Sequence, residues 1–233
     1  MDDADGLIRL VCDAVDPGAR ASAAEALGQV TGDTAAAGEA LLGALNDSDD
    51  LVRAEAADAL GRLRYRLAGA ALAVLLAGDR SPVVRASAAE SLGDIGDPAH
   101  LGPVVAAARH DEDEAVRAYS AATLGLLGAE DETLRSLHTD ELSTWVRTEL
   151  SLARYRRGAI PLSAALAPLD TADRELAERL LNALDDLASR PRRHVTATDA
   201  NTVMTVLSRL ADRIPELQTH TRSVIRTWHH DDR

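Results

Sequence analysis

A ten-residue block recurs along the first two thirds of the chain, and it constrains the fold more than any other feature. The block reads Val-Arg-Ala-Glu-Ala-Ala-Asp-Ala-Leu-Gly at 52–61, and close copies begin at Val84 and Val116. Weaker copies occupy 19–28 and 146–155, and the last of these ends on Tyr instead of Gly. The shared arginines stand at positions 20, 53, 85, 117 and 147, so the period is 30 to 33 residues. Internal repeats of this length indicate a solenoid of stacked units.

Each unit is predicted to be a pair of antiparallel helices, here called A and B, with the block in helix B. A stretch with apolar residues at helical spacing, such as Leu41 and Leu45, precedes each block. Acidic turns separate the two helices, at 47–50, 79–82 and 111–114. Their Asp and Ser residues are typical helix caps, and Pro82 suits a first helical turn. Phe is absent and Ala and Leu supply the apolar content, which favours closely packed helices over sheets.

The pattern Asp-x-x-x-x-Val-Arg-x-x-Ala-x-x-x-Leu-Gly resembles the short HEAT-like repeat of phycobilisome bilin lyases, which many bacterial adaptor proteins share. The resemblance covers roughly residues 16 to 158. It implies an all-α fold, a right-handed α–α superhelix, and a domain of HEAT-like repeats over 1–158. The ankyrin and tetratricopeptide signatures, which have similar periods, are absent from the sequence.

Residues 159–233 lack the Val-Arg motif but keep amphipathic patterns. The stretch 172–189 carries Leu176, Leu180, Leu184 and Leu187 at helical spacing, and two more such stretches follow a basic segment at 190–194. We expect a divergent helical cap, because the open end of a solenoid needs its last apolar face covered. A separate small C-terminal bundle is the alternative.

Charge and residue usage exclude several classes of partner and chemistry. The formal net charge is −13, and residues 1–158 hold 27 acidic side chains against 15 arginines, whereas residues 159–233 hold 11 against 10. An acidic repeat region repels phosphate backbones, so we expect no nucleic-acid partner. Without a single Lys, neither a P-loop lysine nor a Schiff-base lysine is available. The lone Cys12, the acidic N-terminus and the lack of a long apolar run indicate a cytoplasmic protein that does not span a membrane.

No reactive or metal-binding constellation stands out. The seven histidines form neither His-x-x-x-His nor Glu-x-x-His pairs, so we expect no metal site and no cofactor. No Gly-x-Ser-x-Gly motif is present, and Cys12 is expected to be buried in the first helix as a small apolar residue. The recurring glycines, among them Gly61 and Gly93, have no preceding strand and are expected to serve close helix packing or helix ends.

The repeated arginines and turn aspartates, such as Arg85 and Asp111, are expected to bond across neighbouring repeats, as they do in HEAT-like proteins. Aligning the B helices on their arginines places another set of side chains on one face, because residues three and four apart share a helix face. In HEAT-like solenoids helix B lines the concave side, which makes this face a candidate groove. The candidate partner-binding residues are Glu25, Glu55, Asp58, Glu90, Asp94, Tyr119, Leu126, Glu149 and Leu152.

The favoured function is a protein–protein interaction scaffold or regulatory adaptor whose groove binds a basic protein or peptide segment with an apolar anchor. The alternative interpretation is that the carboxylates are merely solvated and the apolar residues pack under the C-terminal cap. Two other functions follow from the fold family alone. A bilin-lyase-like enzyme or chaperone would change the absorbance of an added tetrapyrrole, and a DNA-repair glycosylase would shift DNA in a gel at low salt.

Overall fold

The computed structural model describes residues 4–31, 34–189 and 197–229. Within these residues the chain forms fourteen α-helices, four short 3-10 helices and no strand. The predicted all-α class is therefore confirmed. Contacts divide the chain into two compact units, Met1–Glu130 and Asp131–Arg233. The boundary predicted after residue 158 marks the end of the Val-Arg motif, and it stays a prediction.

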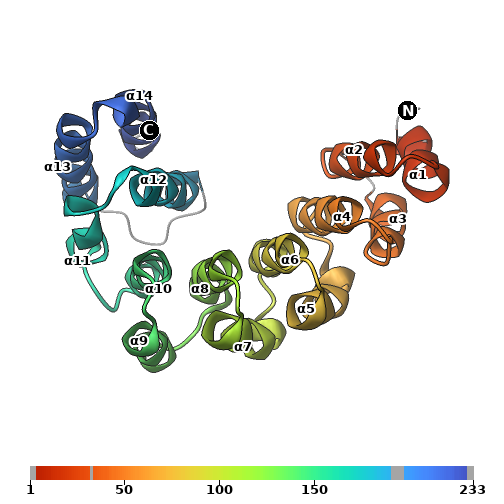
Figure 1. Ribbon diagram of the computed structural model, residues 1–233, viewed down its shortest axis with the longest axis horizontal. Coiled ribbons are helices and arrows are strands. Elements are labelled where there is room, and N and C mark those ends of the chain that lie inside the picture. The colour runs from red at the N-terminus through yellow and green to blue at the C-terminus, as the bar shows by residue number, and fades with distance from the viewer. Residues whose placement is uncertain (1–3, 32–33, 190–196, 230–233) are drawn as a thin grey trace. The chain divides into compact units, whose positions relative to one another are not determined.

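The first unit consists of four helical hairpins. Its helices are α1 (Ala4–Asp13), α2 (Pro17–Leu27), α3 (Ala35–Ala44), α4 (Asp50–Arg62), η1 (Arg66–Ala68), α5 (Gly69–Gly78), α6 (Pro82–Ile95), η2 (Pro98–His100), α7 (Leu101–His110) and α8 (Glu114–Leu127). The B helices α2, α4, α6 and α8 pack one on the next, and the A helices form a second row (Figure 1). This two-row stack is the arrangement expected of a repeat solenoid. The predicted burial of Cys12 is wrong, because Cys12 lies on a side of α1 that does not pack against α2 or α3 and is exposed.

The second unit keeps the same alternation although most of it lacks the motif. Its helices are α9 (Asp131–Asp140), α10 (Thr144–Arg156), α11 (Leu162–Ala165), η3 (Ala167–Asp170), α12 (Arg174–Ser189), α13 (Ala197–Arg213), η4 (Pro215–Leu217) and α14 (Gln218–His229). Helix α12 packs against both α10 and α14, while α11 packs against α13. One apolar core, which includes Leu180, Leu184 and Leu207, joins these helices. Helices α13 and α14 pack as a further hairpin, and the choice between a divergent cap and a separate small bundle stays a prediction.

The turn residues start the B helices as the sequence predicts. Asp49 and Asp113 are N-caps whose carboxylates accept hydrogen bonds from the backbone N–H groups of the first turn. Such bonds satisfy donors that have no partner inside the helix. Pro82 is the first residue of α6, where its missing N–H costs nothing.

Close packing explains the recurring glycine of helix B. A Cβ at Gly61 would lie 2.9 Å from the Ser91 Cα atom, which belongs to the backbone of the next B helix. In the same interface the Ser91 hydroxyl donates a 2.8 Å hydrogen bond to the Ala57 carbonyl. Helices α4 and α6 therefore approach so closely that only glycine fits at position 61.

Gly61→Ala is expected to lower the free energy of unfolding by about 1–3 kcal/mol, because the added methyl group must push two helix backbones apart. Gly43→Ala is the matched control, since Gly43 is an exposed residue of α3 where an added Cβ would meet nothing within 4 Å. The control should stabilise the protein by about 0.5–1 kcal/mol through helix propensity. Urea unfolding of both variants measures the difference, and equal stabilisation of both would contradict the close approach.

Candidate functional site

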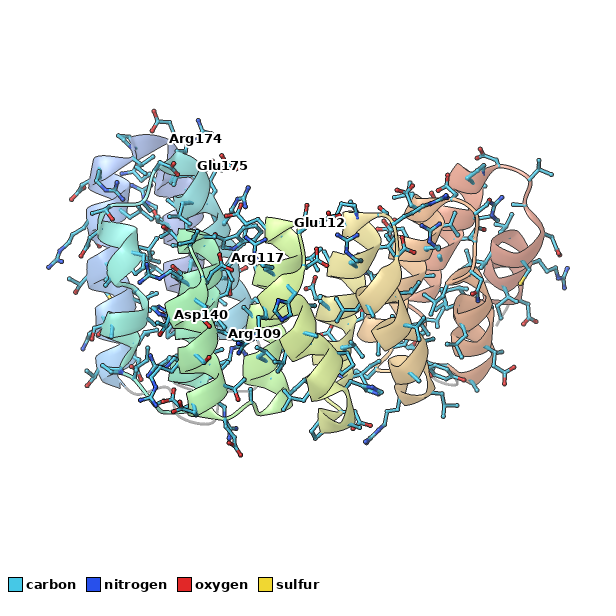
Figure 2. All side chains as sticks on the ribbon, turned by 60° about the horizontal axis from the view of Figure 1, so that its bottom comes forward. Arg109, Glu112, Arg117, Asp140, Arg174 and Glu175 are labelled. Carbon is cyan, nitrogen blue, oxygen red and sulfur yellow. The ribbon has the colours of Figure 1, made fainter. Side chains whose placement is uncertain are left out.

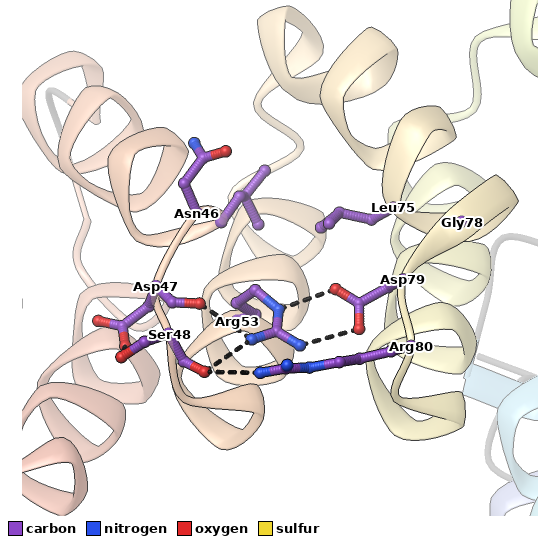
Figure 3. Close-up of a pocket in the computed structure, with 9 residues that line it drawn as sticks. Asn46, Asp47, Ser48, Arg53, Leu75, Gly78, Asp79 and Arg80 are labelled. Carbon is purple, nitrogen blue, oxygen red and sulfur yellow. Dashed lines mark hydrogen bonds and ion pairs between the residues drawn. The ribbon is translucent and has the colours of Figure 1, made fainter.

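The repeated arginines form a buried ladder that links one repeat to the next. Arg53 donates from Nε and Nη2 to both carboxylate oxygens of Asp79, at 2.8 and 2.9 Å, and from Nη1 to the Asp47 carbonyl at 2.9 Å (Figure 3). Both side chains of the Arg53–Asp79 pair are only 7% exposed. Arg20 and Arg85 make the same bidentate contacts with Asp47 and Asp111. The structural role predicted for these residues is confirmed.

The turns hold each aspartate in place for its arginine. The Ser81 N–H group donates to Asp79 Oδ1 at 2.8 Å, and Asp47 and Asp111 accept equivalent bonds from the residue two positions later. Burial by itself would raise the pKa of Asp79, but the hydrogen bonds from Arg53 and Ser81 outweigh it and lower that pKa. In the fourth hairpin Arg117 of α8 donates to the backbone carbonyls of Asp111 and Glu112, which lie in the turn before that helix. Figure 2 labels Arg117 and Glu112.

A pocket of about 390 Å³ lies between the turns of the second and third hairpins. Its lining includes Asp47, Arg53, Asp79 and Arg80. These charged groups already bond to one another or to backbone carbonyls, since Arg80 also donates to the Ser48 carbonyl at 3.2 Å. The pocket is therefore a by-product of the ladder.

The predicted binding face has its acidic part on three adjacent B helices. We call the five residues Glu25 of α2, Glu55 and Asp58 of α4, and Glu90 and Asp94 of α6 the acidic face. Glu25 and Glu90 are exposed, whereas the other three are half-buried. The structure therefore leaves all five at least partly accessible.

The carboxylates of the acidic face act on each other across the helices. Burial, and then the charge of Glu25, raises the pKa of Glu55. Burial raises the pKa of Asp58 to about 6, and the charges of Glu55 and Asp94 add to this, while Ser87 and Arg62 oppose it. Like charges held together in this way favour either protonation or a nearby cation.

The remaining predicted residues are placed differently. Tyr119 on α8 is 40% exposed, whereas Leu126 is half-buried with its Cδ1 atom close to Gly93 of α6. Glu149 and Leu152 lie on α10 in the second unit and are buried, and Leu152 belongs to that unit's core. A partner has no access to Leu152 in this structure. The burial of Leu152 agrees with the alternative interpretation, in which the apolar residues pack under the cap, because α12 packs against α10.

Glu149 is buried, and its neighbours include both an aromatic ring and charged side chains. The Trp145 indole N–H donates to its Oε1 atom at 3.3 Å, and the Arg179 guanidinium lies 4.1 Å from the centre of the Trp145 ring. Burial raises the pKa of Glu149 to about 7, opposed by the Trp145 hydrogen bond and the charge of Arg156.

Sequence reasoning missed two exposed apolar residues at the start of helix B. Leu51 and Val83 each stand two positions before the repeat arginine and are 52% and 60% exposed. The same alignment on the arginines contains this signal, since position −2 shares a helix face with positions +2, +5 and +9.

Comparison with known proteins identifies the repeat. The family model described as HEAT repeats matches residues 4–92 and 69–153. The chain belongs to the HEAT repeat family. This HEAT repeat protein has no match among curated protein sequences.

Solved structures agree with this assignment. The chain is similar to a structure of the complex of CpcE and CpcF of phycocyanin lyase from Nostoc sp. PCC7120, with a TM-score of 0.68 and 20% identity over 97% of this chain and 94% of that chain. It is also similar to YibA from Escherichia coli, with a TM-score of 0.56 and 19% identity over 98% of this chain and 82% of that chain. At these identities the likeness establishes the fold.

In the part of the chain that the structure describes, no three His, Cys, Asp or Glu side chains gather as they would around a metal ion. None of the helices described combines the length and apolar character that crossing a membrane requires. The basic segment 190–194 lies outside the described residues.

Proposed function

We propose that this HEAT repeat protein is an interaction scaffold whose acidic face binds a basic segment of a partner protein. The observation that carries the proposal is the placement of Glu25, Glu55, Asp58 and Asp94 on three neighbouring B helices. Burial raises the pKa of Glu55 and Asp58, and the charges of Glu25 on Glu55, and of Glu55 and Asp94 on Asp58, raise it further. The ladder arginines form ion pairs with Asp47, Asp79 and Asp111, so they do not neutralise the acidic face.

A cationic partner would relieve this repulsion. An arginine or lysine placed among the carboxylates lowers the cost of keeping Glu55 and Asp58 ionised, and complementary charge also speeds the encounter of two proteins. The similar structure from Nostoc is itself a complex of two proteins, CpcE and CpcF, which is consistent with protein binding by such a fold.

Charge reversal tests the proposal. Glu25→Arg combined with Glu90→Arg should remove proteins that the wild type captures from a lysate of the native host, because both residues are exposed parts of the acidic face. Asp5→Arg combined with Glu39→Arg is the control, since it changes the net charge equally on exposed positions of α1 and α3. Mass spectrometry compares the captured proteins.

Salt supplies a second measurement on any protein captured in this way. Raising the ionic strength from 0.1 M to 1 M shortens the Debye length from about 10 Å to about 3 Å, so association should slow markedly. Capture of the same proteins by both variants, with no effect of salt on the association rate, would refute the proposal.

A further inference from the structure

Exposed apolar side chains lie beside the acidic face. Leu51 on α4, Val83 on α6 and Tyr119 on α8 are 52%, 60% and 40% exposed. We call these three residues the apolar row, since they come from three consecutive B helices of the first unit (Figure 1). Leu51 and Val83 stand two residues before the repeat arginine, and Tyr119 stands two residues after it, one helical turn further along. Large apolar residues exposed side by side on neighbouring repeats are a feature of interaction surfaces.

The apolar row and the acidic face share one side of each helix. On α4, Leu51 is followed at helical spacing by Glu55 and Asp58, and on α6, Val83 is followed by Ser87 and Glu90. Leu51 and Val83 therefore stand at the N-terminal turns of their helices, with carboxylates one and two turns later on α4 and two turns later on α6, while Tyr119 lies in the second turn of α8. The surface changes from apolar to acidic along the direction of the helices.

Folding does not require the apolar side chains at the helix starts. The backbone N–H of Leu51 donates to the capping carboxylate of Asp49 at 3.0 Å, while its side chain points away from the core. In the next repeat Pro82 starts α6 and leaves the side chain of Val83 in solvent. Polar side chains would serve equally well at both positions for stability.

We propose that the apolar row and the acidic face together hold one basic segment of a partner protein, with apolar side chains spaced to match successive B helices. The inference rests on the proposed function and specifies the partner's sequence pattern. Packed helices lie about 8–10 Å apart. Three residues of extended chain cover about 10 Å, as do seven residues of helix. The segment therefore carries apolar residues three apart if it is extended, or seven apart if it is helical, with Arg or Lys between them.

Charge decides between a basic partner and a second copy of this chain. A symmetric dimer through this surface would bring two acidic faces together, and the whole chain already carries a net charge of −13. A basic segment meets the same carboxylates with attraction, while its apolar side chains cover Leu51 and Val83.

The test selects short random peptides displayed on phage against the intact protein. We expect enriched peptides that are basic and carry apolar residues three or seven apart. Synthetic peptides with the enriched sequences should bind the double variant Leu51→Asn and Val83→Thr at least about tenfold more weakly than the wild type, because the apolar area buried on binding is lost. The control is Leu67→Asn combined with Val74→Thr, two exposed apolar residues near and on α5 in the other row, and it should bind like the wild type.

The outcomes separate this inference from the proposed function. One outcome is that basic peptides lose binding to the Glu25→Arg and Glu90→Arg variant but bind the Leu51 and Val83 variant as well as the wild type. This result would overturn the inference and leave the proposed function standing. If no basic peptides are enriched, or if their binding is unchanged by Glu25→Arg and Glu90→Arg, both the inference and the proposed function would be overturned. Sedimentation that shows a dimer in the wild type and a monomer in the Leu51 and Val83 variant would assign the surface to self-association instead.

Discussion

Arg53→Ala is expected to lower the free energy of unfolding by about 3–5 kcal/mol, the cost of breaking a buried ion pair by removing one partner. The substitution removes both hydrogen bonds to Asp79 and the bond to the Asp47 carbonyl, and it leaves the Asp79 carboxylate largely buried. Urea unfolding followed by circular dichroism measures the change.

A surface ion pair provides the control for Arg53. Arg66 is mostly exposed and lies 3.8 Å from Asp97, so Arg66→Ala should cost about 1 kcal/mol or less. A double-mutant cycle with Asp79→Ala then isolates the coupling within the ladder. If Arg53→Ala cost no more than Arg66→Ala, the ladder would not be a main source of cohesion between repeats.

The stability of the protein should also depend on pH through Glu149. Its pKa is about 7 in the folded state and about 4.5 when unfolded, so the folded state binds the extra proton between these values. Stability therefore falls as the pH rises through this window, and the cost reaches about 3 kcal/mol above pH 7. Below pH 4.5 both states are protonated and the cost disappears.

Glu149→Gln removes this cost, because the amide stays neutral and its oxygen can still accept the Trp145 indole N–H. The variant should match the wild type near pH 4 and exceed its stability by about 3 kcal/mol near pH 8. Glu39→Gln, at an exposed position of α3 in the first unit, reports the effect of net charge alone. A constant difference between Glu149→Gln and the wild type from pH 4 to 8 would show that Glu149 does not titrate in this window.

The contacts that the repeats make could be predicted in detail, because they join residues of one hairpin or of neighbouring hairpins and recur along the chain. The spacing of the arginines, the acidic turns and the closing glycines each belong to one hairpin and recur in the next. The bonds of Arg85 to Asp111 and to the Asp79 carbonyl are the contacts expected of such a ladder. The close approach at Gly61 is likewise the packing expected of a glycine at that position.

The candidate face could be predicted only in part. Alignment on the arginines correctly brought Glu25, Glu55 and Asp58 onto neighbouring helices, because these residues repeat in register. The same alignment put Glu149 and Glu55 at equivalent positions, yet Glu149 is buried and Glu55 is half-exposed. The difference arises from their neighbours, since Trp145 and helix α12 surround Glu149.

The sequence by itself determined the class of fold, the hairpin unit, the helix starts and the ladder, because each follows from capping, helical periodicity and charge pairing over short distances. Only the tertiary structure decided that residues after 158 continue as hairpins, that Leu152 is a core residue, and that Leu51 and Val83 stay exposed. Burial depends on which helix packs against a residue, and amphipathic patterns such as those of α12 and α14 identify a buried face without identifying the partner that covers it.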